Sequence, residues 1–346
     1  MIGIDFFCGG GGMTKGLLDS GVDILFGFDS NPNCRDTYEL NNHIPYLCLD
    51  ITQLDIKQVI HQFPEINYNK ELVAVGCAPC QPFSKQRNSS QEHSAMNLLD
   101  YFGRIVASIL PGFVVVENVP GIENKPVFVR FLSMLQEQGY QVVYRVLNAK
   151  NFGVPQNRRR LVLIASRICM PELPEETHGD QKCEYQTVRD AIYKYPALRA
   201  GEKSDIVPNH VAARLSELNT MRIKATPHDG GGRTDWPLDL VLKCHSGEHK
   251  GHTDVYGRMQ WNQVAPTLTS KCFSLSNGRF GHPVQDRAIS LREAAALQSF
   301  PDEYIFYGSQ VEIGKQIGNA VPVLLAQKIG DKIQELYNHS LNQNNE

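Results

Sequence analysis

Short apolar runs alternate with helical patterns through the first half of the chain, and this alternation constrains the fold more than any other feature. The runs are rich in Val, Ile and Phe and end at Gly, Pro, Asn or Asp, which is typical of buried strands. Apolar strands joined through helices predict a parallel sheet covered on both faces, a doubly wound, Rossmann-like α/β domain that binds ligands at the carboxyl ends of its strands. The predicted strands are Met1–Phe7, Ile24–Phe28, Leu72–Val75, Phe113–Val116, Gln141–Leu147 and Leu161–Ala165, and the predicted helices cover about 13–20, 32–41, 53–62, 96–109 and 127–138.

The second half has a different character, because residues 170–285 hold many Pro, Gly, His and polar residues and little periodicity. We interpret this stretch as a smaller, irregular domain. Regularity returns in a helix over 290–299, where Ser290 and Glu293 predict a capping box, and in a last helix over about 322–337. The expected organisation is one domain from 1–167 and 305–346, a smaller domain from 170–285, and a hinge with a returning helix at 286–304.

Composition excludes several classes of protein. With 42% apolar and 21% charged residues, the chain is neither disordered nor fibrous. No apolar run approaches the ~18 residues of a spanning helix, and Asp5 interrupts the first apolar stretch, which argues against a signal peptide. We therefore expect a cytoplasmic protein. The net charge of −3 does not by itself indicate nucleic-acid binding, but a local basic face is compatible with it.

Cysteine and histidine spacing argues against a metal site. Only Cys77 and Cys80 form a C-x-x-C pair, and no second close pair completes a zinc site. His245, His249 and His252 lie close together, but their surroundings are rich in Gly and Lys and favour a polar loop. We predict no metal.

A glycine loop follows the first predicted strand. Gly9–Gly12 let the backbone pass close to a ligand, and the next helix offers free N–H groups. The second strand ends at Asp29, where an acid suits ribose hydroxyls, and a third candidate strand, around 46–49, ends at Asp50, where an acid could receive an amino group. The spacing departs from G-x-G-x-x-G, so loop and acids suggest a nucleoside-bearing ligand without pyrophosphate; the alternative is a plain tight turn.

A second group of polar residues follows later strands. Cys80 comes directly after a strand, where active sites of such folds gather. A structural cysteine and a redox pair are the alternatives, but a redox pair sits at a helix N-terminus, whereas Pro79 and Pro82 predict an extended turn. The next strand ends at Glu117, whose carboxylate could face the thiol, although a Glu there is more often a capping residue.

The run Gln156-Asn157-Arg158-Arg159-Arg160 is the last of these segments. Its alternative interpretation is a solvated charge run. In a strand, alternation would place Arg158 and Arg160 on one face and Arg159 on the other.

In their order along the chain, these segments resemble the C5-cytosine DNA methyltransferases, and the resemblance covers nearly the whole chain. The matching motifs are the cofactor loop at Phe7–Gly12, Pro79-Cys80-Gln81, Glu117–Val119, Gln156 with Arg158 and Arg160, Arg292–Pro301, and Gly318–Val321. Three departures stand out: Asp29 is Glu in many members, Ala78 replaces a common proline, and His93–Asn97 stands where an Arg-Gly pair usually precedes Leu98.

The resemblance implies S-adenosylmethionine (SAM) as cofactor and a covalent mechanism. Attack of the Cys80 thiolate on cytosine C6 makes C5 nucleophilic towards a sulfonium methyl group. Glu117 would act at N3 as acid or hydrogen-bond partner, for which it needs a raised pKa. Arg160 would hold the base O2, and Arg158 would steady the pocket or the nearby backbone.

The resemblance also assigns binding residues. The SAM-binding residues are Phe7, Gly9, Gly10, Gly11, Gly12, Asp29, Ser30, Asp50, Ile51, Pro79, Leu98, Asn319 and Val321, and the substrate-binding residues are Gln81, Ser84, Lys85 and Arg87. The segment 84–97 becomes a lid over DNA, and 170–285 becomes the target-recognition domain, which reads base edges after the cytosine is flipped out.

The resemblance implies double-stranded DNA as the substrate, and it is compatible with a companion restriction endonuclease. We expect a monomer that does not associate with membranes. Three alternatives remain at this point. A tRNA cytosine-C5 methyltransferase shares the motifs, a catalytically silent SAM-binding module shares the cofactor loop, and a thiol redox protein would use the C-x-x-C pair. The variable region favours DNA, and the joint presence of Cys80, Glu117, Arg158 and Arg160 favours an enzyme.

Overall fold

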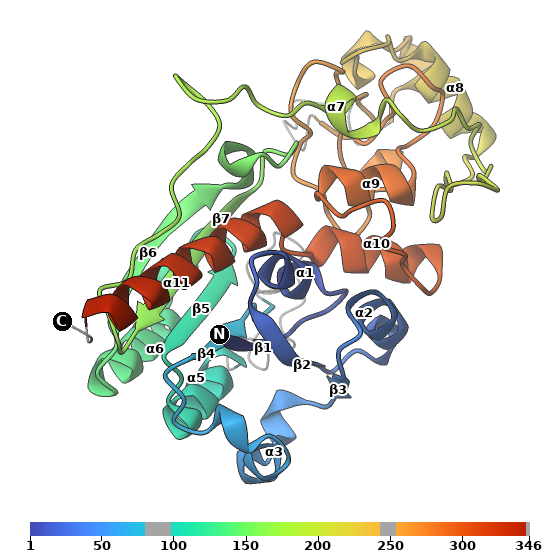
Figure 1. The fold of residues 1–346 in the computed structure, drawn as a ribbon. Coiled ribbons are helices and arrows are strands. Elements are labelled where there is room, and N and C mark those ends of the chain that lie inside the picture. Colours follow the sequence, from blue (N-terminus) through green and yellow to red (C-terminus); the bar gives the residue numbers. More distant parts are fainter. Residues whose placement is uncertain (80–97, 243–253, 344–346) are drawn as a thin grey trace. The chain divides into compact units, whose positions relative to one another are not determined.

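The protein, seen in a computed structural model, is described over residues 1–79, 98–242 and 254–343 (Figure 1). The chain divides into two compact units. The first unit comprises Met1–Asn148, Arg159–Glu176 and Val321–Glu346, and the second comprises Ala149–Arg158 and Thr177–Ala320.

These boundaries differ from the expected ones in three segments: residues 149–158 and 305–320 belong to the second unit, and residues 170–176 belong to the first. Contacts of residues 317 and 318 with the second unit explain the placement of 305–320. The Gln298 side chain donates to the Ile317 carbonyl at 2.7 Å. A Cβ on Gly318 would lie 2.2 Å from the Thr269 carbonyl oxygen, so the two backbones are in close contact. The functional roles of the two parts stay a prediction.

A seven-stranded sheet forms the centre of the first unit, in the order β3-β2-β1-β4-β5-β7-β6. Each strand expected from the apolar runs is present within two residues of its expected bounds, which confirms the doubly wound α/β class. The order reverses direction between β1 and β4, and a crevice for ligands lies beyond the carboxyl ends of strands at such a point. The strands are β1 (Ile2–Phe6), β2 (Asp23–Asp29), β3 (Tyr46–Cys48), β4 (Leu72–Gly76), β5 (Phe113–Asn118), β6 (Gln141–Asn148) and β7 (Arg159–Ser166).

One strand breaks the expected parallel arrangement. Strands β1 to β5 pair in parallel, but β7 lies between β5 and β6 and is antiparallel to both. Only a short connection, containing the 3-10 turn Ala149–Phe152, joins β6 to β7. A parallel pair needs a crossover of a dozen or more residues, so a short connection leaves the antiparallel pairing.

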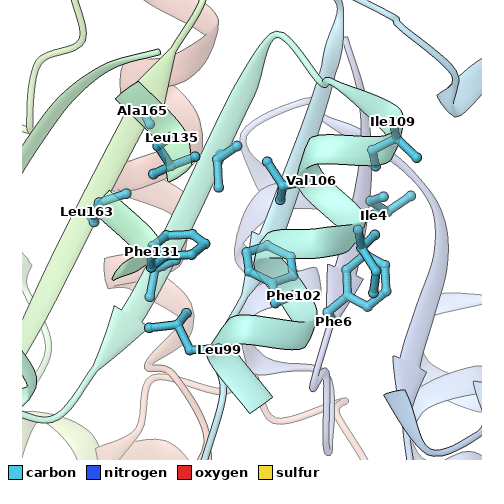
Figure 2. Close-up of a cluster of buried hydrophobic side chains, with 14 of the residues drawn as sticks. Ile4, Phe6, Leu99, Phe102, Val106, Ile109, Phe131, Leu135, Leu163 and Ala165 are labelled. Atoms are coloured by element: carbon cyan, nitrogen blue, oxygen red, sulfur yellow. The ribbon is translucent and has the colours of Figure 1, made fainter. Parts of the chain in front are cut away.

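Helices cover both faces of this sheet. Strand alternation places Ile4 and Phe6 on the face of α5 and α6, where a large apolar cluster forms (Figure 2). Helices α1 and α11 pack against each other on the other side (Figure 1). The helices of the first unit are α1 (Gly12–Asp19), α2 (Arg35–Asn42), α3 (Ile56–Gln62), α5 (Leu98–Ile109), α6 (Pro126–Glu137) and α11 (Val323–Gln343).

The contact between α1 and α11 depends on a glycine. A Cβ on Gly16 would lie 2.4 Å from the Ala326 Cβ and from the Val323 carbonyl oxygen. Only Gly lets the two backbones approach this closely, so the last helix packs directly on the helix that follows the glycine loop. Within residues 1–79, 98–242 and 254–343, no helix combines the length and the apolar character needed to span a membrane.

The second unit has little regular structure, as its composition predicts, and buried arginines hold it together. The fully buried Arg258 guanidinium donates to the carbonyls of Ile223, Thr226, His282 and Gln285. A small apolar cluster forms beside it. The helices are α7 (Val188–Ile192), α8 (Glu217–Ala225), α9 (Leu291–Leu297) and α10 (Gln310–Asn319), and the apolar cluster consists of Ile223, Trp236, Leu240, Tyr256, Leu275 and Ala288.

Helix α9 confirms the capping box at Ser290 and Glu293. Helices α7 and α10 were missed, although each begins with a capping box of the same kind, Thr187 with Asp190 and Ser309 with Glu312. The capping residues of both helices can therefore be seen in the sequence, but the helices that follow them are only five and ten residues long and carry few apolar residues.

Candidate active site

The glycine loop after β1 is folded against the end of β2. The Gly9 N–H donates to Asp29 Oδ2 at 3.0 Å, and the Phe7 and Cys8 N–H groups both donate to the Phe28 carbonyl. Gly9 and Gly11 have positive φ, 51° and 85°, which residues with a Cβ adopt only at a cost. The loop thus presents backbone at the carboxyl end of β1, with no side chain at Gly9 or Gly11 to obstruct a ligand.

The two predicted acids follow neighbouring strands: Asp29 is the last residue of β2, and Asp50 comes two residues after the end of β3. Asp29 pairs with Cys48 in the β2–β3 ladder, so Asp29 and Asp50 lie at the same edge of the sheet. Asp50 is exposed and caps the turn Ile51–Gln53 by accepting from the Thr52 N–H at 2.9 Å. The structure therefore brings together the loop and both acids that the sequence predicted.

Asp29 differs from Asp50 in its surroundings. Burial raises the pKa of the Asp29 carboxyl, while hydrogen bonds from the Asn31, Gly9 and Ser30 backbones act in the opposite direction. A carboxylate held at the rim of a backbone loop is a suitable acceptor for hydroxyl groups of a ligand. Of the neighbouring predicted residues, Ser30 is exposed and Ile51 is buried.

The predicted nucleophile Cys80 lies outside the described residues, as do Gln81, Ser84, Lys85 and Arg87. The chain just before Cys80 is well placed. The Cys77 N–H donates to the Phe6 carbonyl at 3.3 Å, and the Asn118 side chain donates to the Ala78 carbonyl at 3.0 Å. Residues 77–79 thus follow directly after β4, and hydrogen bonds hold them to the carboxyl ends of β1 and β5.

Cys77 does not suit a redox pair. Desolvation raises the pKa of its thiol well above the usual range, and the nearby Glu117 charge adds to the effect. A redox-active cysteine needs the opposite shift, towards the thiolate. The other two predicted residues near this edge are Pro79, which is exposed, and Leu98, which is partly buried at the start of α5.

Glu117 and Arg160 form a largely buried ion pair. Arg160 Nε lies 3.1 Å from Glu117 Oε1, with the two side chains 14% and 9% exposed. The antiparallel β5–β7 ladder sets this contact, because it pairs Glu117 with Val162 and so brings the start of β7 to the end of β5. Arg160 also donates to the Arg159 carbonyl. The pair presents a positioned carboxylate and further guanidinium N–H donors at the strand end beside Ala78.

Gln156 and Arg158 belong to the second unit, and all their described partners lie there. Both side chains are buried. Arg158 donates to the carbonyls of Leu268, Gly318 and Ala320, each at 3.1 Å. These contacts favour the backbone-steadying role for Arg158 over a direct role in chemistry.

The two predicted SAM-binding residues near the end of the chain lie in different units. Asn319 is exposed at the end of α10, whereas Val321 is buried and belongs to the first unit. The described residues contain no group of three or more His, Cys, Asp or Glu side chains that could hold a metal, and His245, His249 and His252 lie outside them. Asp5 was missed as a functional candidate, although a charged residue inside an apolar strand is a readable signal.

The comparisons with known proteins show the family of this chain. A family model described as C-5 cytosine-specific DNA methylase matches residues 1–335. The chain is 40% identical to the Type II methylase M.HgiDII of Herpetosiphon aurantiacus, over 96% of this chain and 94% of that one. It is 34% identical to the Type II methyltransferase M1.HphI of Haemophilus parahaemolyticus, over 96% and 86%.

Solved structures agree on the fold. A protein described as a DNA modification methyltransferase encoded within an E. coli prophage superposes with a TM-score of 0.72, at 21% identity and over 98% of this chain and 99% of that one. The S. pombe Dnmt2 methyltransferase superposes with a TM-score of 0.63, at 16% identity and over 98% of both chains.

Proposed function

This chain belongs to the family of C-5 cytosine-specific DNA methylases and is a methyltransferase that acts on DNA cytosine; we propose that it uses SAM, a flipped-out cytosine and a covalent bond from Cys80 to C6. One observation carries the proposal. A glycine loop with two acids lies at the ends of β1 to β3, and the Glu117–Arg160 pair lies where the end of β5 meets the start of β7. The chain leading to Cys80 begins between them.

The residues at the β1–β3 edge fit SAM. Backbone without side chains at Gly9 and Gly11, an acceptor at Asp29 and an exposed carboxylate at Asp50 suit a nucleoside with hydroxyl and amino groups. In this proposal Asp29 binds the ribose hydroxyls and Asp50 receives an amino group. When bound, SAM supplies the methyl group on a positively charged sulfur.

The residues at the β4–β7 edge fit cytosine. The Cys80 thiolate would add to C6 and make C5 nucleophilic towards the methyl group that SAM would supply; as the C5–methyl bond forms, the sulfur–methyl bond would break and the sulfur would leave as a neutral thioether. Glu117 holds the ring at N3, and Arg160 donates to O2, so that charge developing on the ring is offset. A base then removes the C5 proton, the C5=C6 bond forms again, and Cys80 leaves as thiolate. The cytosine must leave the duplex for these steps.

The proposed partners follow from the relatives and from the second unit. Because the relatives are named as Type II enzymes, we propose a companion restriction endonuclease. We place DNA-sequence recognition in residues 170–285 and phosphate contacts at Lys85 and Arg87, and we propose a cytoplasmic monomer.

A methyl-transfer assay tests the function. The purified protein with labelled SAM should methylate double-stranded DNA containing its target sequence and should leave tRNA unmodified. Bisulfite sequencing should place the mark on one cytosine of a recurring sequence. Transfer to tRNA but not to DNA would refute the proposal, and binding of SAM without transfer to either would indicate a silent module.

Asp29→Ala is expected to weaken SAM binding about ten- to hundred-fold, because a hydrogen bond to a charged group contributes about 1.5–3 kcal/mol. Calorimetric titration with SAM measures the change. Asp36→Ala, in an exposed first turn of α2, is the matched control and should bind SAM as the wild type does. Unchanged affinity in Asp29→Ala would place the ribose elsewhere.

Exchange of residues 170–285 for the same region of a relative with a known target should transfer the target sequence. This segment contains Arg258 and the four carbonyls that its guanidinium binds, so this buried network lies entirely within the exchanged piece. Base readout also needs loops that reach into a groove. SAM affinity should stay unchanged, and bisulfite sequencing should report the new sites. An active chimera that keeps the original target would refute the recognition role.

A further inference from the structure

A buried hydrogen-bonded chain lies beneath the glycine loop. Alternation in β1 turns Asp5 away from the cluster that holds Ile4 and Phe6 (Figure 2). Thr14, in α1, donates its hydroxyl to Asp5 Oδ2 at 2.7 Å, and the Tyr38 hydroxyl of α2 lies 2.9 Å from the same Thr14 oxygen. A hydroxyl has one hydrogen, so Tyr38 donates to Thr14 when Asp5 is ionised and accepts the Thr14 hydrogen. All three residues are fully buried.

This chain replaces a missing helix cap. Helix α1 begins after Gly11, which has no side chain with which to cap it. Asp5 instead hydrogen-bonds the side chain and the backbone of Thr14 in the first turn. Gly27 leaves the room for Tyr38, because a Cβ there would lie 2.4 Å from the Tyr38 hydroxyl. The Asp5 carboxylate therefore ties β1 to the helix that ends the glycine loop.

Asp5 is also a buried carboxyl group without a full set of hydrogen-bond partners among the described residues. Its Oδ1 has no hydrogen-bond partner in the part of the chain that the structure describes. Burial raises the pKa of Asp5 to about 7, the bond from Thr14 opposes the shift, and the Asp29 charge adds to it. The thiols of Cys8 and Cys77, the other titratable neighbours, stay neutral because desolvation raises their pKa well above the usual range.

We propose that Asp5 is a positioning residue that couples SAM binding to the release of a proton from its own carboxyl group. The inference rests on the proposed SAM site. A cation bound at the loop favours the ionised form of nearby Asp5. Ionised Asp5 in turn accepts more strongly from Thr14 and so holds the first turn of α1.

The direction of the pH effect follows from this coupling. Free protein near neutral pH carries Asp5 partly protonated, because its pKa is about 7. Bound SAM lowers that pKa, so binding releases a proton; affinity rises with pH up to about 7 and levels off above it. The rise is about tenfold for each unit by which the bound cation lowers the pKa.

Calorimetry on the wild-type protein tests the proposal. Titrations with SAM at pH 7 in two buffers of different ionisation enthalpy should show release of about half a proton. S-adenosylhomocysteine has the same amino and carboxyl groups but lacks the sulfonium charge, so its titration should show less release. Equal proton counts for the two ligands, with both bound, would overturn the inference and leave the proposed function intact. Absence of SAM binding at every pH would overturn the proposed function.

Three variants test whether the released proton comes from Asp5 or from Asp29, and whether the bond from Thr14 sets the pKa of Asp5. Asp5→Asn should remove the difference in proton release between the two ligands. If the difference persists, Asp29 is its source and the inference fails. Thr14→Val, which keeps Asp5 but removes a bond that stabilises its charge, should move the midpoint of the affinity–pH curve to higher pH. Tyr38→Phe leaves the Thr14–Asp5 bond in place and should keep the wild-type midpoint.

Discussion

Cys80→Ser is expected to lose methyl transfer by about three orders of magnitude or more while binding SAM as the wild type does, because a serine hydroxyl is a far poorer nucleophile towards C6 than a thiolate. Single-turnover assays with labelled SAM measure the loss, and calorimetry measures the retained affinity. Cys169→Ser, outside both the proposed catalytic residues and the recognition region, is the matched control and should keep its activity.

A mechanism-based probe makes this test specific. DNA with 5-fluorocytosine at the target should trap the wild-type protein covalently, because fluorine at C5 cannot be removed as a proton and Cys80 cannot leave. The adduct should survive denaturing electrophoresis, and peptide mapping should find it on Cys80. Trapping of Cys80→Ser at the wild-type rate would refute the assignment of the nucleophile.

Glu117→Gln should slow methyl transfer about 10²- to 10⁴-fold, the usual contribution of a positioned acid or base. Glutamine keeps the size of the side chain but removes the charge that pairs with Arg160 at 3.1 Å. SAM affinity should change little, because Asp29 ends β2 and Asp50 caps the turn Ile51–Gln53 after β3, away from β5, which carries Glu117. Glu137→Gln, exposed at the end of α6, is the control for loss of a carboxylate and should be as active as the wild type.

The Arg160→Lys variant separates charge from geometry in this pair. Lysine retains the positive charge but lacks the planar set of donors that lets Arg160 bind Glu117 and a base oxygen together. Because the positive charge is retained, we expect Arg160→Lys to lose less methyl-transfer activity than Glu117→Gln. Full activity of Glu117→Gln in the same assay would show that N3 is held by another group.

Much of the first unit could be predicted because its signals are local. Strand burial is visible as short apolar runs, and Gly9–Gly12, Asp29 and Asp50 follow those runs directly. Carboxyl ends of adjacent parallel strands must meet at one edge, so the loop and the acids were expected together. The capping box of α9 is equally local, since its two members stand three residues apart.

What required the tertiary structure depends on pairings between distant segments. Nothing in the sequence near Arg160 reveals that β7 lies between β5 and β6, yet its pairing with β5 brings Arg160 to Glu117. Arg158, two residues earlier, is turned to backbone carbonyls of the second unit. An alternating strand pattern specifies which side chains share a face, but it does not specify which partner each face meets.

The sequence by itself determined the family and the α/β class, and it supplied the predictions for the SAM site, Cys80 and Glu117, because these depend on residue types at short spacing. The tertiary structure alone decided the position of β7, the placement of 305–320 in the second unit and the link from Asp5 through Thr14 to Tyr38. The physical reason is that a buried polar group must find its hydrogen-bond partners wherever the packed chain brings them, and distance along the sequence says nothing about which partners those are.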